Sequence, residues 1–543
     1  MTTGPGNASR RGRHTRRSLL GATLGLPLLS ACTLPGRDAA PEAGLRVLAS
    51  PEVTALVQLA QGQARTAGYR LVADYRDQAA MFAILADPDH PYDLVWPATS
   101  LILGLAAPAR PLSEPLTFAQ SPIVWAVKQS VADRASWLDR DVAAADLRDV
   151  ITADQNAWRY AMAGAAHVGS ATAAFLGLLT AFARTGGPVS VAALDRVGVT
   201  DDLIPMLQAV TRSAPTARGL TNVVASRYSD FELLITAETE LVAANRALVG
   251  VAQEPLRAIY PVDAQGVLDA PLIAIDGSDP VRRDRALALQ RAMTANALRQ
   301  AISDAGWYPN VAAGVRKDPA IYVEEWGIGD AWRSRIVEPP DAATWREAMT
   351  RYQQSYRKPS VTVIAVDRSG SIADANVGDL QAALEAVLLP EQTTSTWLQA
   401  TPDDVTIAVP FTVELGEPLT VRGNAPDDFH WLASQLAAQR SAGGTNLYDA
   451  ARRGLWAIED AGLGDRLGAV ILVTDGQSNE GNIKLVDGAW DDSPIGEQVA
   501  VHAVLVGDSW TDQVQPIVAR TAGQLFDNAG DLPSALRTAR GGN

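Results

Sequence analysis

Short apolar runs alternate with helical patterns along most of the chain from residue 45 onwards. The runs 45–49, 69–73 and 93–96 have the length and β-branched content of strands, and residues 52–67 and 79–85 between them have helical spacing. Repeated strand–helix units favour a mostly parallel sheet with helices on both faces. The pattern therefore predicts an α/β fold.

A second group of elements follows without a break in this alternation. An apolar run at 121–127 reads as a strand that crosses to another lobe, and a helical pattern starts at Ser278-Asp279-Pro280 and continues to about residue 305. Between them the pattern predicts strands at 158–163, 233–236, 258–260 and 272–275 and a helix at 171–184. The pattern thus predicts two successive groups of strands and helices before residue 325.

Several polar residues that could bind a ligand or a metal ion follow the strand-like run 361–366. Asp367, Ser369 and Ser371 follow this run at alternate positions and precede a helical pattern. A loop at the carboxyl end of a strand is where open α/β sheets bind ligands. One carboxylate and two hydroxyls are hard ligands, which suit Mg²⁺ or Mn²⁺ rather than zinc.

Two later stretches repeat this arrangement. The Gly-rich loop 441–446 presents Thr445 just before a helical pattern at 447–458, and the apolar run 469–473 ends in Thr474-Asp475-Gly476. A D-x-S-x-S string alone fills ordinary turns, but these two stretches place further oxygen ligands at the ends of neighbouring elements.

In these residues the chain resembles the von Willebrand factor A (VWA) family, whose metal-ion-dependent adhesion site consists of D-x-S-x-S, a downstream Thr and a further Asp. The matching residues are Asp367, Ser369, Ser371, Thr445 and Asp475. The resemblance implies a Rossmann-like doubly wound domain over residues 360–543. It also implies a Mg²⁺ (or Mn²⁺) ion with an open coordination position, which an Asp or Glu of a protein partner completes.

Residues 44–325 resemble bacterial extracellular solute-binding proteins, which have two α/β lobes and a hinge. The resemblance rests on the strand order and on short strings: Thr236-Ala237-Glu238, Tyr260-Pro261 with Gly266 and Pro271, and Ala305-Gly306-Trp307. It implies a two-lobed periplasmic-binding-protein-like fold and a possible small-molecule ligand.

The ligand-binding loop of that family is only partly matched. The loop 163–170 lacks the usual run of serines, and only His167, Gly169 and Ser170 are candidates to bind an oxyanion at a helix N-terminus. Ser50, at the end of the first strand, is a further candidate. A capping serine and a surface histidine are the alternative interpretation.

The N-terminus has the features of an export signal. A basic stretch that includes Arg16-Arg17 is followed by an apolar stretch at 18–31 that is short for a membrane span, and then by Cys32. Leu29-Ser30-Ala31-Cys32 resembles a bacterial lipobox, and residues 15–20 resemble a twin-arginine signal. We therefore expect a lipoprotein signal peptide at 1–32, a lipid on Cys32, a tether at 33–43 and a location at the extracytoplasmic face of the cell membrane.

Composition excludes several classes of function. The net charge of −15 over 543 residues argues against nucleic acid as a partner. Five histidines without an H-x-x-x-H pair and a single cysteine give no zinc pattern. Residues 476–480 begin like a G-x-S-x-G nucleophile elbow but have Glu480 in place of the last glycine. We expect no enzymatic activity.

Three functions agree with these features. The first is a lipid-anchored binding protein that engages a protein partner through the VWA metal site, with the two-lobed domain sensing or docking a ligand. The second is the solute-binding component of a transport system, in which the VWA domain is a docking module. The third is a scaffold that the metal stiffens. Residues 326–359 are expected to connect the two domains, with their tryptophans packed against one of them.

Overall fold

Three β-sheets organise the part of the chain that the computed structural model describes, which is residues 44–154, 157–277, 279–373, 377–507, 510–526 and 531–542. Internal contacts divide the chain into two units, Met1–Glu42 and Ala43–Asn543. The predicted signal peptide, the lipobox Cys32 and the tether fall outside the described residues. Within the described residues, no helix is both long and apolar enough to cross a membrane.

The first sheet has the strand order β2-β1-β3-β9. Its strand β1 pairs in parallel with β2 and β3, and β9 returns antiparallel to β3. Leu45 and Val47 of β1 face helix α1, whereas Leu48 faces helix α2. The elements are β1 (Leu45–Ala49), α1 (Thr54–Thr66), β2 (Leu71–Tyr75), α2 (Gln78–Leu85), β3 (Leu94–Trp96), β9 (Ile273–Ala274) and α9 (Pro280–Ala292).

The second sheet is centred on the long strand β4 (Ala119–Lys128), which pairs antiparallel with β6, β7, β8 and β10. Strand β5 (Tyr160–Met162) extends it in parallel with β6. The further strands are β6 (Leu233–Ala237), β7 (Leu256–Ile259), β8 (Val267–Leu268) and β10 (Tyr308–Pro309). Its main helices are α5 (Gly169–Ala183), α7 (Ala217–Ser226) and α8 (Glu238–Gly250).

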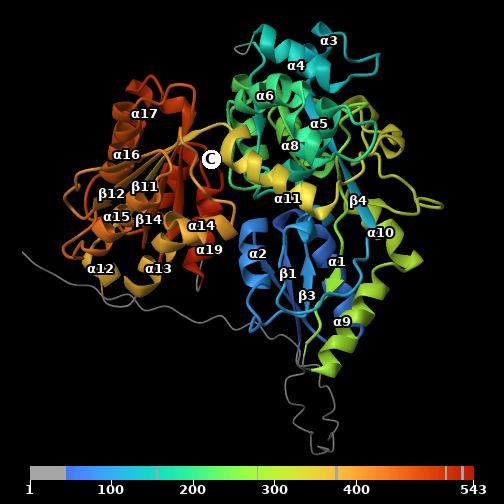
Figure 1. Cartoon of the computed structure of the whole chain (residues 1–543), viewed down its shortest axis with the longest axis horizontal. Coiled ribbons are helices and arrows are strands. Elements are labelled where there is room, and N and C mark those ends of the chain that lie inside the picture. Colours follow the sequence, from blue (N-terminus) through green and yellow to red (C-terminus); the bar gives the residue numbers. More distant parts are fainter. Residues whose placement is uncertain are drawn as a thin grey trace, which may run out of the picture. The chain divides into compact units, whose positions relative to one another are not determined.

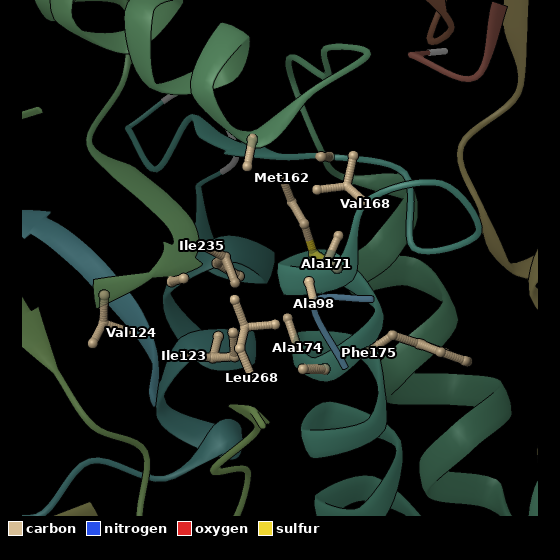
Figure 2. Packing of buried hydrophobic residues seen from close by; sticks show 14 of the residues in the cluster. Ala98, Ile123, Val124, Met162, Val168, Ala171, Ala174, Phe175, Ile235 and Leu268 are labelled. Atoms are coloured by element: carbon tan, nitrogen blue, oxygen red, sulfur yellow. The ribbon is translucent and has the colours of Figure 1, made fainter. Parts of the chain in front are cut away.

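Helix α5 is buried along almost its whole length against this second sheet. Figure 2 shows Ala171, Ala174 and Phe175 of α5 among Ile123 of β4, Leu268 of β8 and Ala98, all of which are buried. Ala98 follows β3 and belongs to the first sheet's part of the chain. The chain thus passes from the first sheet to the second and returns to the first sheet with β9. The two sheets form two lobes, each built from discontinuous segments of the chain, as expected.

Residues 342–356 pack against the two-lobed part. They form α11 (Ala342–Arg351) and the π-helical turn η9 (Tyr352–Tyr356). The rings of Trp345 and Tyr352 lie 5.8 and 4.9 Å from the ring of Phe175, and the Tyr352 hydroxyl accepts a hydrogen bond from Ala165 N–H at 3.0 Å. Trp345 is fully buried, which confirms that a connector tryptophan packs on one domain.

The third sheet has the order β13-β12-β11-β14-β15-β16 and is parallel except for β13. Strand β13 forms the antiparallel edge of this sheet beside β12. The strands are β11 (Ser360–Asp367), β12 (Val405–Phe411), β13 (Leu419–Arg422), β14 (Leu467–Thr474), β15 (Val499–Leu505) and β16 (Leu525–Phe526).

Helices cover both faces of the third sheet, as Figure 1 shows for the labelled strands β11, β12 and β14. Val363 of β11 packs toward α16, α17 and α18, and Ile364 packs toward α13, α15 and α19. This doubly wound α/β arrangement is the predicted fold. The helices are α12 (Gly370–Ala373), α13 (Val377–Leu388), α14 (Pro390–Ser395), α15 (Pro426–Ala437), α16 (Leu447–Ala461), α17 (Ile483–Asp492), α18 (Val514–Arg520) and α19 (Leu532–Arg540).

Candidate functional site

Asp367 is the last residue of β11 and is completely buried. Its two carboxylate oxygens accept hydrogen bonds from different elements: Oδ1 from Ser369 N–H at 2.8 Å and Oδ2 from the Thr474 hydroxyl at 2.7 Å. Thr474 ends β14, the parallel neighbour of β11. The carboxyl ends of two adjacent strands therefore meet at this side chain, as the sequence predicts.

The two predicted serine ligands lie side by side. Ser369 Oγ and Ser371 Oγ are 3.0 Å apart, and Ser369 is buried whereas Ser371 is exposed. The group of oxygens therefore starts at a buried carboxylate and ends at a solvent-exposed hydroxyl. This geometry leaves the Ser371 side open to an incoming group.

Backbone hydrogen bonds hold the Gly-rich loop against the Asp367 loop. Gly370 N–H donates to Gly443 O at 3.0 Å, and Ala442 N–H donates to Arg368 O at 2.9 Å. Gly443 has a φ of 77°, which an L side chain rarely adopts, so a glycine is favoured at this turn. The buried Thr445 is thus brought to the same edge of the sheet as Asp367.

Asn479 fixes Thr445 and was not identified from the sequence. Its Oδ1 accepts from Thr445 N–H at 2.7 Å, and its own N–H donates to Thr445 O at 2.8 Å. A Cβ on Gly444 would lie 2.3 Å from Asn479 Oδ1, so the glycine leaves room for this amide. The available signal was the polar stretch that directly follows Asp475, in the turn after β14.

Asp475 comes directly after β14 and is buried. Its Oδ1 accepts a hydrogen bond from Gln477 N–H at 3.2 Å, and its carbonyl accepts from Trp510 N–H at 2.9 Å. The structure therefore brings all five predicted residues to one edge of the third sheet, where its parallel strands have their carboxyl ends.

The hydrogen-bond donors around the buried carboxylate of Asp367 carry no charge. Burial, with a smaller contribution from the charge of Asp475, raises the pKa of Asp367 to about 6, although hydrogen bonds from Ser369 and Thr474 oppose the shift. Both donors are neutral. The neighbouring Arg368 turns away, and its guanidinium donates to Leu436 O at 2.7 Å. Within the described residues, no cationic side chain lies within ion-pair distance of Asp367.

The residues at this edge fit a hard divalent cation. Two carboxylates would neutralise a dication, and the hydroxyls of Ser369, Ser371 and Thr445 are oxygen donors of the kind that Mg²⁺ prefers. Among the residues described, no three His, Cys, Asp or Glu side chains group as a metal site. A metal at this edge would therefore depend on hydroxyl ligands.

The candidate residues of the two-lobed domain have internal partners. The carboxylate of Glu52 accepts hydrogen bonds from Gly169 N–H at 2.7 Å and from Ser170 N–H at 2.9 Å, at the first turn of α5. Ser50 accepts from Glu52 N–H at 3.3 Å and so caps the turn that carries this glutamate. The helix N-terminus predicted for an oxyanion holds a carboxylate of the chain itself, which sequence reasoning missed.

His167 is buried rather than exposed. Its Nε2 lies 3.1 Å from Trp397 O, and its carbonyl accepts from Gln78 N–H at 3.3 Å. Burial lowers the pKa of the imidazole, with an opposing contribution from Asp77. These contacts are those of a histidine that packs between separate segments of the chain.

A cavity of about 400 Å³ remains beside Glu52, between segments of both lobes. The first lobe contributes Glu52, the second contributes Arg218, Glu240 and Arg246, and Trp307 lines the cavity just before β10. Arg218 binds both carboxylate oxygens of Glu240, at 2.7 and 3.1 Å. The cavity is therefore lined by charges of both signs.

No family model and no curated protein matches the chain. Among solved structures, it is similar to the periplasmic binding protein AfuA from Actinobacillus pleuropneumoniae, solved with bound fructose-6-phosphate (10% identity, 57% of this chain and 96% of that chain, TM-score 0.41). It is also similar to the sulfate-binding protein SubI from Mycobacterium tuberculosis (16% identity, 56% and 96%, TM-score 0.39).

A further similarity is to an aerotolerance-related membrane protein from Bacteroides fragilis (15% identity, 33% of this chain and 96% of that chain, TM-score 0.24). TM-scores below 0.5 at these identities carry no inference about ligand or function. The assignment to the α/β class, with a two-lobed part followed by a doubly wound part, follows from the three sheets and their strand orders.

Proposed function

We propose that this chain is a binding protein that engages a carboxylate of a protein partner through Mg²⁺ at the edge of the third sheet. The observation that carries the proposal is the arrangement around Asp367. This buried carboxylate accepts hydrogen bonds from neutral donors among the described residues, and it lies beside paired serine hydroxyls that reach the surface at Ser371.

The chain's own residues have separable roles in this proposal. Asp367, Ser369, Ser371, Thr445 and Asp475 would hold the ion, directly or through water. The hydrogen bonds from Ser369 N–H and Thr474 orient the carboxylate of Asp367, and Asn479 orients Thr445. When bound, the ion supplies a positive charge with a free coordination position, which attracts an Asp or Glu side chain.

The proposal includes an extracytoplasmic location. It rests on the resemblance of residues 29–32 to a lipobox, which would place a lipid on Cys32 and the described residues outside the cytoplasm. Metabolic labelling with a clickable fatty acid tests this, because Cys32→Ser would abolish the label. Labelling of the variant at the level of the wild type would contradict the proposal.

A pull-down from cell-envelope extract tests the metal-dependent binding. We expect the full chain to retain a protein in Mg²⁺ and to lose it in EDTA, and Asp367→Ala to retain none in either buffer. Asp460→Ala is a matched control, because Asp460 is exposed on α16. Equal retention by wild type and Asp367→Ala, or retention in EDTA, would refute the metal-dependent function.

A second candidate function is small-molecule binding in the interlobe cavity. The observation that favours it is a cavity of about 400 Å³ lined by acidic and basic side chains of both lobes. A thermal-shift screen of zwitterionic and anionic metabolites tests it, since a ligand at 100 times its Kd adds about 2.7 kcal/mol of stability. A stabilising ligand whose effect is lost in Arg246→Gln would support this function, and a screen without one would exclude it for those classes.

A further inference from the structure

A further cavity lies at the edge of the third sheet opposite Asp367. It has a volume of about 540 Å³, within the range of roughly 300 to 1,000 Å³ of small-molecule sites. Its walls come from η9, α13, α14, α15 and α19 and the loop after α14, and they include Leu388, Leu398, Gln399, Phe429 and Arg540. Thr394 and Asn424 at its rim are exposed, so the cavity is reachable from solvent.

Arg540 of α19 is the notable residue of this cavity. The side chain is nine-tenths buried, and its Nη1 is buried without a hydrogen-bond partner among the described residues. A buried guanidinium N–H that has lost water without gaining a partner carries a desolvation cost, and such groups in folded proteins generally have a partner.

The carboxylate of Asp404, which attracts Arg540, already has ion-pair and hydrogen-bond partners. Asp404 is buried and paired with Arg357, and its oxygens also accept from Thr401 N–H at 2.7 Å and Ser360 N–H at 2.6 Å. Burial, with the positive charge of Arg357 as a further cause, lowers the pKa of Arg540 to about 10 despite the opposing attraction of Asp404. Arg357 thus takes up the ion-pairing capacity of Asp404, and within the described residues no carboxylate lies within ion-pair distance of Arg540.

A second residue of the cavity wall, Gln399, carries an unsatisfied polar atom. Gln399 Oε1 is buried without a hydrogen-bond partner within the described residues, and it can accept a hydrogen bond. Leu388, Leu398 and Phe429 supply apolar surface between these polar groups. A ligand that complements this cavity therefore has a negatively charged group to pair with Arg540, a hydrogen-bond donor for Gln399 and an apolar body.

We propose that this cavity binds a small organic carboxylate with an apolar body and a hydrogen-bond donor, in which the carboxylate pairs with Arg540. The apolar body lies against Leu388 and Phe429, and the donor reaches Gln399. This site is separate from the proposed metal site and does not depend on it.

Titration calorimetry of the full chain in EDTA tests the proposal with 4-hydroxyphenylacetate as the probe and the neutral 4-hydroxyphenylacetamide as its isostere. We expect the wild type to bind the anion at least about tenfold more tightly than the amide, which corresponds to about 1.4 kcal/mol. Arg540→Gln is expected to remove that preference. Arg537→Gln is the matched control, because Arg537 lies one turn earlier on α19 and does not line the cavity.

A second variant keeps the test decisive if Arg540→Gln fails to fold. Thr394→Trp places a large ring at the exposed rim and is expected to weaken binding of the anion while leaving the far-ultraviolet circular dichroism unchanged. Equal affinities for the anion and the amide, undiminished binding by Arg540→Gln or Thr394→Trp, or no binding of the anion at millimolar concentration would each overturn the proposal.

Discussion

At the scale of single residues, His502 shows how burial couples a side chain to pH. It is buried in β15, and its Nδ1 accepts a hydrogen bond from Gln524 N–H at 3.1 Å. Burial, with the charge of Arg212 nearby, lowers the pKa of His502 to about 3. The folded protein therefore keeps this imidazole neutral, whereas the unfolded chain protonates it near pH 6.5.

This difference predicts acid destabilisation between about pH 6.5 and pH 3. As pH falls through this window, unfolding takes up a proton at His502, and stability declines by about 1.4 kcal/mol per pH unit from this residue. His502→Asn keeps an acceptor for Gln524 N–H but removes the titration. Urea midpoints at pH 7.5 and 5 should therefore differ less in the variant than in the wild type. Equal differences would contradict the prediction.

Gly444 tests the role of Asn479 at the proposed metal site. A Cβ in Gly444→Ala would displace Asn479 Oδ1 and break its hydrogen bond to Thr445 N–H, at a cost of roughly 1 to 2 kcal/mol. We expect a smaller rise in melting temperature on addition of Mg²⁺. Gly488→Ala is the control, because a Cβ there meets no atom within 4 Å. An unchanged response to Mg²⁺ in Gly444→Ala would show that Asn479 does not position Thr445.

At the scale of elements, helix α5 joins the two lobes through its N-terminus. Glu52 of the first lobe accepts from the N–H groups of Gly169 and Ser170, and Gln78 of α2 donates to the Thr172 hydroxyl at 2.6 Å. A Cβ on Gly169 would lie 2.6 Å from Ala98 Cβ, so the glycine permits close approach of the lobes. Although these donors stabilise the carboxylate, burial raises the pKa of Glu52.

Removing this carboxylate should loosen the contact between the lobes. Glu52→Ala leaves two backbone N–H groups without their acceptor, which costs roughly 1 to 3 kcal/mol for each group that stays buried. We expect a lower melting temperature, partly restored by sulfate if the anion replaces the carboxylate at α5. Glu338→Ala is the control because Glu338 is exposed. A melting temperature equal to that of the wild type would exclude this role for Glu52.

At the scale of the whole molecule, Ala43–Asn543 is one contact unit although its sheets divide it into a two-lobed part and a doubly wound part. The buried Arg212 links them, because its guanidinium donates to Gln498 O at 2.8 Å and to Thr521 O at 3.2 Å. Arg76 adds an ion pair with Asp531 at 3.2 Å, and the Thr538 hydroxyl donates to Asp77.

These contacts predict that the two parts unfold together. Arg212→Met removes the donors and leaves buried carbonyls unpaired, which weakens the link by roughly 2 to 3 kcal/mol. Calorimetry should show one transition for the wild type and two for the variant. Arg65→Met is the control, since Arg65 is exposed on α1. Two transitions already in the wild type would show that the link is too weak to couple the parts.

The sequence by itself determined the elements and the candidate metal ligands. Strand-like runs such as 361–366 and 469–473 predict buried parallel strands, and Asp367 and Asp475 directly follow them. Because parallel strands end at the same edge of a sheet, local pattern was enough to group these residues. The resemblance to the VWA family supplied the roles of Ser369, Ser371 and Thr445 that pattern alone leaves open.

Only the tertiary structure decided which partners the buried polar groups find. Glu52 lies more than one hundred residues from the α5 N–H groups that it binds. Among the described residues, Asp404 is paired with Arg357, which comes from a distant part of the chain, and not with Arg540. Hydrophobic periodicity reports which side of an element is buried, but it does not say what lies opposite. Pairing between distant polar groups is fixed by how the elements pack, because a hydrogen bond needs its two atoms within about 3 Å.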